Sequence, residues 1–116
     1  KLDRATLNKN INLKNKKVVV FSAIADQQSF IEEIEKEGAV VYRKINFRDH
    51  YNYSQEDLDQ IDLSCQGYGV DFLITTEKDW VKIESFNVKH PVIVFSSTIY
   101  FRDNNQLIKA IQKIIN

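Results

Sequence analysis

The chain of 116 residues contains no methionine, one cysteine, one proline and three glycines. It begins at Lys1 without an initiator methionine, so we expect a mature fragment or an excised domain rather than a whole natural protein. Cys65 has no second cysteine with which to form an internal disulfide or a Cys-x-x-Cys motif for metal or redox chemistry. We therefore expect it to be an ordinary thiol in or near a helix, behaving as a small hydrophobe.

An excess of charge of either sign is also missing, because sixteen basic and sixteen acidic side chains cancel. A nucleic-acid partner is disfavoured, since such proteins normally carry a large positive field. No apolar run approaches the roughly eighteen residues of a transmembrane helix, and no signal-peptide pattern opens the chain. These absences predict a soluble segment, compatible with the cytoplasm, and the length of 116 residues predicts one domain.

The scarcity of glycine removes the common nucleotide-binding loops. Residues 21–26, the turn after the first expected strand, contain no glycine that would let the backbone approach a pyrophosphate. A Walker A sequence is absent as well. Classical NAD binding is therefore disfavoured, and the chain by itself has no conventional cradle for nucleotide phosphates.

Short apolar runs rich in β-branched residues alternate with helical segments. The expected strands are residues 16–21, 39–47, 70–75 and 91–96. Helices are expected to open near Asp26, Ser54, Glu77 and Asp103, and residues 1–15 read as an irregular lead-in. Strands that alternate with helices predict a mostly parallel sheet covered on both faces, a three-layer α/β sandwich of the Rossmann or flavodoxin-like type. We expect it to form one domain over residues 1–116.

The ends of the expected helices carry local signals. Asp26 is typical of an N-cap, and Gly38 of the C′ position of the same helix. Ser54 and Asp57 have the spacing of a capping box. The helix that follows is expected to carry its apolar side chains at Leu58, Ile61 and Leu63.

Because the carboxyl ends of parallel strands meet at one edge of a sheet, the segments that follow the strands should gather there. These segments are residues 22–26, 47–50, 75–79 and 96–98. His50 is a candidate general base, since a histidine near its unperturbed pKa can take a proton from a hydroxyl. Its neighbour Asp49 need not be its partner, because adjacent residues of an extended segment point to opposite sides. An ordinary surface histidine remains the alternative, and His90 is expected at the opposite edge in a structural role.

The segment Thr76-Glu77-Lys78-Asp79 permits two interpretations. In one, Thr76 caps a helix, Asp79 closes the capping box and the acidic side chains meet the positive end of the helix dipole. In the other, Lys78 balances an anionic ligand, because a cation in the first turn is unfavourable unless a ligand or Glu77 offsets it. Nearby aromatic residues are expected to be packing groups with a polar handle: Tyr51, Tyr53 and Trp80.

These motifs resemble the C-terminal part of the tetraacyldisaccharide 4'-kinase family, the lipid A 4'-kinases. The similar pieces are residues 20–25 with 29–30, 47–50 with 57–58, 75–82, and 91–92. Thr-Glu-Lys-Asp with its trailing Val-Lys is the most specific, and Phe-x-Asp-His precedes it at the right distance. The chain departs from the family at residues 23–27, where a Gly-Ile-x-Asn-Pro-like turn is usual.

The resemblance implies that the complete enzyme transfers the γ-phosphoryl group of ATP, with Mg²⁺, to the 4'-hydroxyl of a tetraacyldisaccharide 1-phosphate. It implies action at the cytoplasmic side of the bacterial inner membrane. The Walker A loop and metal-binding carboxylates would belong to a preceding N-terminal P-loop lobe, so this chain would be the C-terminal lobe, inactive alone and without metal or cofactor ligands. The family's catalytic histidine matches His50, which would pair with an aspartate of the other lobe. Residues near substrate or nucleotide would be Asp49, Thr76, Glu77, Lys78 and Asp79.

Other classes of function remain open on the residues alone. A non-catalytic flavodoxin-like module would use the same edge to bind a small ligand or a protein. A receiver-type phosphoacceptor domain would need acidic residues after the first and third strands, where the chain has Ser22-Ala23 and Thr75-Thr76. A free-standing enzyme with His50 as general base lacks a nucleophile or cofactor motif.

Overall fold

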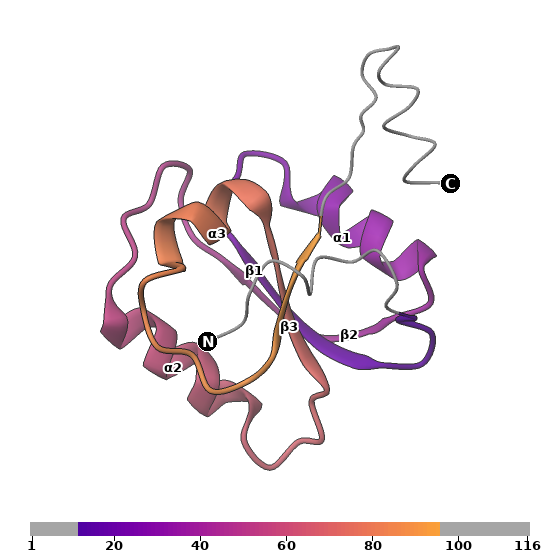
Figure 1. Ribbon diagram of the computed structural model, residues 1–116. Helices are drawn as coiled ribbons and strands as arrows, with labels where there is room; N and C mark the ends of the chain where they lie inside the picture. Colours follow the sequence, from indigo (N-terminus) through magenta and orange to yellow (C-terminus); the bar gives the residue numbers. More distant parts are fainter. Residues whose placement is uncertain (1–11, 96–116) are drawn as a thin grey trace.

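A computed structural model describes residues 12–95 of the chain (Figure 1). The described strands are β1 (Lys17–Ser22), β2 (Val40–Asn46), β3 (Phe72–Thr76) and β4 (Val92–Phe95). The described helices are α1 (Gln27–Lys36), α2 (Gln55–Cys65) and α3 (Glu77–Ile83). Most of the expected lead-in, residues 96–98 and the helix expected after Asp103 lie outside the described residues.

The four strands form one parallel sheet in the order β2-β1-β3-β4. The chain leaves β1 toward β2 at one edge, then returns past β1 to place β3 on its other side. The connections from β1 and β3 therefore run in opposite directions, and the boundary between these strands is the topological switch point where such sheets usually bind ligands. The expected parallel sheet is confirmed, with the strand order of flavodoxin-like folds.

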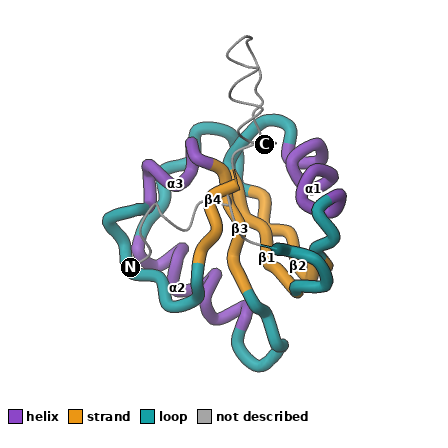
Figure 2. The backbone as a smooth tube through the Cα atoms, turned by 45° about the vertical axis from the view of Figure 1, so that its right-hand side comes forward, coloured by secondary structure: helices purple, strands orange, loops and turns teal. Residues whose placement is uncertain are grey.

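Helices cover both faces of the sheet, as Figure 2 shows with α1 on one side and α2 and α3 on the other. Each face has its own hydrophobic cluster, because successive side chains of the buried central strands point to opposite sides. The cluster under α1 includes Val18, Val20, Phe30, Ile31, Ile34 and Ile74. The cluster under α2 and α3 includes Val19, Leu58, Ile61, Leu73, Trp80 and Ile83. The predicted three-layer α/β architecture is thus confirmed.

The predicted ends of α1 are also confirmed. The Asp26 side chain accepts the main-chain N–H of Ser29 at 3.1 Å and its hydroxyl at 2.8 Å, and these bonds lower the pKa of Asp26. Gly38 follows the C-cap residue Glu37 with φ +93°, a conformation that glycine adopts without strain. A Cβ atom there would also lie 3.1 Å from Cα of Lys14. The helix ends where the sequence predicts.

In α2 the capping box of Ser54 and Asp57 is present, but the predicted apolar face needs one correction. Leu63 is 55% exposed, because it follows the buried Ile61 by two residues and so lies about 200° around the helix. Cys65, one turn beyond Ile61, takes the inward position and directs its sulfur toward the Ile61 carbonyl. Burial raises the pKa of Cys65, which fits the ordinary buried thiol that we expected.

Candidate functional site

The segments that follow β1, β2 and β3 meet at the carboxyl edge of the sheet, as predicted. Phe47, just beyond β2, donates its main-chain N–H to the Ser22 carbonyl at the end of β1. Ala23 donates its main-chain N–H to the carboxylate of Asp79 in α3 at 3.0 Å. In Figure 1 the loop from β2 to α2 lies beside α3 at this edge. The fourth expected segment, residues 96–98, is outside the described residues.

His50 lies in a tight turn of this loop and has left-handed backbone, with φ +65°. The main-chain N–H of Tyr51 closes the turn by donating to the Arg48 carbonyl at 3.1 Å. For a residue other than glycine, this backbone conformation costs about 1 kcal/mol or more. Within the described residues only Asn15, at the opposite edge, shares this conformation without being glycine. Such strained positions often mark functional sites.

The turn presents the imidazole of His50 to solvent. Its side chain is 77% exposed, and its Nε2 atom lies 3.8 Å from Oδ2 of Asp49, which is 44% exposed. This separation allows an electrostatic interaction but is too long for a hydrogen bond. Asp49 therefore lies close to His50 without fixing the orientation of the ring.

Beneath the turn, aromatic rings pack against one another as predicted. Phe47 and Tyr51 are stacked with ring centroids 4.6 Å apart, and Tyr53 meets both edge-on at 5.1 and 5.4 Å. Tyr53 also contacts Phe21 of β1 edge-on at 6.1 Å. These contacts join the loop to the hydrophobic core under α2 and α3.

The hydroxyl groups of the two tyrosines anchor the same loop. Tyr51 donates to the Asp57 carboxylate, whose oxygens lie 3.1 and 3.0 Å away, and this bond raises the pKa of Tyr51. Tyr53 donates to Oδ1 of Asp79 at 3.0 Å. Burial, followed by the negative charge of Asp79, raises the pKa of Tyr53. Both hydroxyls are thereby kept protonated, as donors.

Asp79 is the most enclosed of the predicted site residues, with 1% exposure. Its Oδ1 atom accepts from the Ala23 N–H and the Tyr53 hydroxyl, each at 3.0 Å. Its Oδ2 atom accepts from the Thr76 hydroxyl at 2.5 Å. The predicted cap is confirmed, since Thr76 accepts the main-chain N–H of Asp79. The prediction that Asp79 closes a capping box is wrong, because among the described residues its carboxylate accepts from Ala23, Tyr53 and the Thr76 hydroxyl and not from the main-chain N–H of Thr76.

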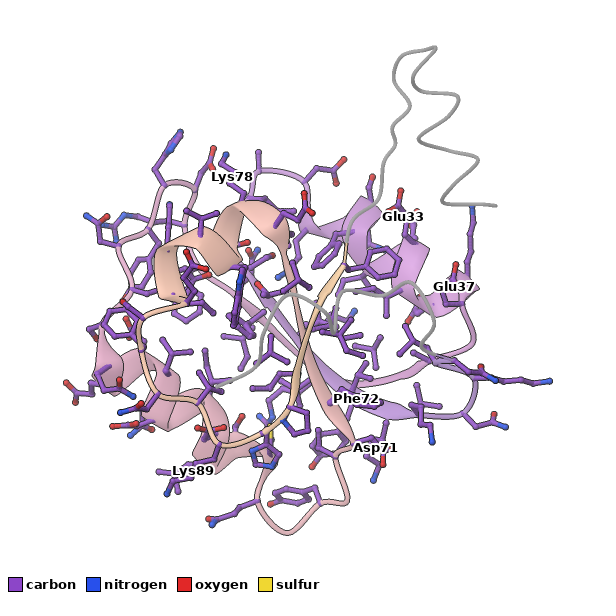
Figure 3. The ribbon with its side chains drawn as sticks, viewed as in Figure 1. Glu33, Glu37, Asp71, Phe72, Lys78 and Lys89 are labelled. Carbon is purple, nitrogen blue, oxygen red and sulfur yellow. The ribbon has the colours of Figure 1, made fainter. Side chains whose placement is uncertain are left out.

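Glu77 and Lys78 are both exposed on the first turn of α3. Figure 3 shows Lys78 at the opposite end of the domain from Asp71 and Lys89. Among residues 12–95 no ion pair joins Lys78 to Glu77, so this neighbour does not offset the cation. The ammonium group of Lys78 faces solvent at the same edge as His50.

His90 has the structural place that we predicted at the opposite edge. Its Nδ1 atom lies 3.0 Å from Oδ1 of Asp62, and the main-chain N–H groups of Lys89 and His90 donate to the same carboxylate. In the described part of the chain, no group of three or more histidine, cysteine or acidic side chains is placed to hold a metal ion. None of the described helices is long and apolar enough to cross a membrane.

Two contacts at this edge were not predicted. Gln27 donates from Nε2 to the Ser22 hydroxyl at 2.8 Å and to the Ile45 carbonyl at 3.1 Å, joining the ends of β1 and β2. Lys82 donates from Nζ to the main-chain carbonyl of Tyr51 at 3.2 Å. Lys82 belongs to the Val-Lys pair that trails the Thr-Glu-Lys-Asp motif, so the sequence pointed to this residue. Its partner could not be predicted, because every residue has a main-chain carbonyl.

Comparison with known proteins extends these observations. The family model described as Tetraacyldisaccharide-1-P 4'-kinase matches residues 2–116. A tetraacyldisaccharide 4'-kinase of Pelagibacter ubique is 28% identical over 87% of the chain, and one of Halothermothrix orenii is 35% identical over 66%. A third, from Desulfatibacillum aliphaticivorans, is 37% identical over 66%.

The chain spans a third or less of the length of these relatives, between 20% and 32%. No solved structure matches it. The resemblance noted from the sequence motifs is confirmed, because the family model extends over nearly the entire sequence. The chain belongs to the tetraacyldisaccharide-1-P 4'-kinase family.

Proposed function

We propose that the chain is the C-terminal lobe of an ATP-dependent lipid kinase and that His50 is its catalytic contribution. The reaction is transfer of the γ-phosphoryl group of ATP to the 4'-hydroxyl of tetraacyldisaccharide 1-phosphate, a step of lipid A biosynthesis. The family assignment supports the reaction. The observation that carries the role of His50 is its exposed imidazole on a left-handed turn, anchored from below at the carboxyl edge.

Phosphoryl transfer depends more on position and charge than on a strong base. In the proposed reaction the 4'-oxygen bonds to the γ-phosphorus, the bond to the β,γ-bridging oxygen breaks and ADP leaves with that electron pair. His50 orients the hydroxyl and accepts its proton. An aspartate of the N-terminal lobe supports the imidazole, and the lipid substrate lies between the lobes.

Mg²⁺ and the nucleotide phosphates are assigned to the rest of the enzyme. The described residues do not suit a resident metal ion, since no cluster of potential ligands is present among them. The turn at residues 21–26 has no glycine for a phosphate cradle either. This lobe therefore requires the N-terminal P-loop lobe for activity, and we place the complete enzyme at the cytoplasmic side of the bacterial inner membrane.

The other residues at this edge have separate proposed roles. Lys78 attracts an anionic oxygen of substrate or nucleotide, as its exposure and lack of an ion pair with Glu77 permit. Asp49 and Glu77 contribute charge near the reacting groups. Thr76 and Asp79 act on the site indirectly, by supporting the structure of this edge, because their side chains bond to each other.

The test is ATP-dependent 4'-phosphorylation of tetraacyldisaccharide 1-phosphate by the full-length protein, wild type against His50→Ala. We expect the variant to lose about 10²- to 10⁴-fold in kcat, the usual contribution of general acid–base catalysis. Asn15→Ala is the matched control, because it also replaces a left-handed residue but at the opposite edge. We expect it to retain wild-type activity.

The outcomes separate the competing functions. An active wild type with an equally active His50→Ala variant removes His50 from the chemistry. An inactive, folded wild type returns the question to a flavodoxin-like module that binds a small ligand or a protein. The isolated lobe, assayed beside the full-length enzyme, should give no transfer.

A further inference from the structure

Helix α3 holds the His50 loop at two points. Asp79 accepts the hydroxyl of Tyr53, and Lys82 donates to the main-chain carbonyl of Tyr51. Asp79 and Lys82 are three residues apart, so they lie on the same face of α3. The partner of Lys82, Tyr51, comes one residue after His50, and the partner of Asp79, Tyr53, comes three residues after it. The helix thus contacts the loop on the side where the chain leaves the left-handed turn.

The Lys82 contact is made to the main-chain carbonyl of Tyr51, the residue after His50. The N–H of Tyr51 donates to the Arg48 carbonyl, while its C=O accepts from Lys82. Both peptide groups that flank the Cα atom of Tyr51 therefore have partners. The first of these peptides directly follows His50, so its orientation determines the direction in which the turn presents the imidazole.

A simpler interpretation is that Lys82 only offsets the negative end of the helix dipole, since it lies in the last turn of α3. Lys36 provides the comparison, because it occupies the last turn of α1 and is exposed. Lys82 differs in being half-buried and in reaching a carbonyl 31 residues away. This long-range bond is what a role in the dipole alone does not require.

We propose that Lys82, supported by Asp79, is a positioning residue that holds the His50 turn in its left-handed conformation. This inference rests on the proposed catalytic role of His50. It assigns part of the Thr-Glu-Lys-Asp…Val-Lys motif to the alignment of the histidine rather than to ligand contact. Alignment matters because a displacement of about 1 Å can cost on the order of 10²-fold in rate.

The first experiment measures kcat and KM of the full-length kinase with Lys82→Met, Lys82→Arg and Lys36→Met. We expect Lys82→Met to lower kcat by about 10- to 100-fold, with KM for ATP and lipid nearly unchanged. Lys82→Arg keeps a donor and should recover most of the loss. Lys36→Met removes a last-turn cation elsewhere and should behave as wild type. Equal kcat values for Lys82→Met and Lys36→Met would overturn the proposal.

A double variant tests whether Lys82 acts through His50. Added to His50→Ala, Lys82→Met should cause no further loss of kcat, because groups that act as a unit are not additive. A further loss as large as in the wild-type background contradicts the proposal, since Lys82 would then act independently of His50.

A readout independent of activity separates this proposal from the proposed function. Hydrogen exchange at the Tyr51 N–H, which closes the turn, should quicken in Lys82→Met and stay unchanged in Lys36→Met. Unchanged exchange in Lys82→Met refutes the positioning role even if His50 proves catalytic. A fully active His50→Ala instead refutes the catalytic role, while the exchange data still decide whether Lys82 holds the turn.

Discussion

The turn at His50 and the carboxylate of Asp79 share one edge of the sheet but are built in opposite ways. His50 is exposed and has left-handed backbone, and within residues 12–95 its imidazole has only a long contact with Asp49. Asp79 is enclosed, and its carboxylate accepts from a main-chain N–H and two hydroxyls. One side chain is free to meet a substrate, whereas the other is fully used in structure. Membership of a motif near a site thus does not imply contact with a ligand.

The groups that stabilise this edge lie around Asp79 rather than at His50. A strained turn persists when well-satisfied groups around it hold it. The Tyr53 hydroxyl is the direct link, because it belongs to the loop of His50 and donates to Asp79. Substitutions at His50 should therefore mainly change activity, whereas substitutions at Asp79 should mainly lower the free energy of unfolding. In one case, His50→Gly, the free energy of unfolding should rise.

The largest expected effect comes from His50→Gly. Activity of the full-length kinase should fall about 10²- to 10⁴-fold through loss of the imidazole. The free energy of unfolding should rise by about 0.5 kcal/mol, because glycine adopts positive φ without a steric penalty. Kinetics and denaturant unfolding measure the two effects. Asn15→Gly should keep full activity and give a smaller gain in stability, because asparagine tolerates left-handed backbone better than most residues. A less stable His50→Gly contradicts the view that the turn is strained.

Asp79→Asn should have the largest effect on stability, a loss of about 3 kcal/mol. The amide keeps the shape of the side chain, but it removes the charge and turns an N–H₂ group toward buried donors. Denaturant unfolding measures the loss. Asp49→Asn is the control, since that carboxylate is exposed and should change stability little. Equal stability of the two variants would show that the buried carboxylate is not a structural element.

Tyr53→Phe should cost about 1 kcal/mol, because it removes one buried hydrogen bond and keeps the ring contacts. Since the pKa of Tyr53 is raised in the folded state, this contribution is complete below the unfolded pKa of about 10 and is lost as pH rises through the folded pKa. The stability difference between wild type and variant should shrink at alkaline pH. Unfolding at pH values on both sides of 10 measures it, with the exposed Tyr68→Phe as control. A difference that grows with pH contradicts the assignment.

The smallest effect is expected for Lys78→Met. Its ammonium group is exposed, so stability should not change. Activity should fall by about 2- to 5-fold if the cation attracts a phosphate oxygen, since exposed charge pairs contribute about 1 kcal/mol or less. Steady-state kinetics with varied ATP and lipid measure it, with Lys36→Met as control. Kinetics that match the control remove Lys78 from the site.

Much of the fold could be predicted because its signals are local. The caps at Asp26, Ser54 and Thr76 depend on residues within three positions, and the strands follow from short apolar runs. Among the described residues, the apolar position Leu63 was wrongly predicted, because it follows the buried Ile61 by only two residues. The positions of His50 and Lys78 just after two strands also place them at the carboxyl edge of the sheet, once the strands are known to be parallel.

The rest could not be predicted because it depends on long-range contacts. The bonds of Asp79 span 56 residues to Ala23 and 26 to Tyr53, and that of Lys82 spans 31 to Tyr51. A capping box was the natural expectation for Asp79 when only its neighbours were visible. The left-handed backbone of His50 could not be predicted either, because the preference of histidine for positive φ is too weak.

The place of Asp79 has a consequence for how this lobe can work. The boundary between β1 and β3 is where sheets of this type usually receive the negative group of a ligand, on main-chain N–H groups such as that of Ala23. Here a carboxylate from α3 already satisfies that N–H, so the protein supplies its own resident anion. The N–H of Ala23 is therefore not free to bind the negative group of a ligand. In the proposed function, the chemistry at this edge therefore takes place at the exposed turn of His50.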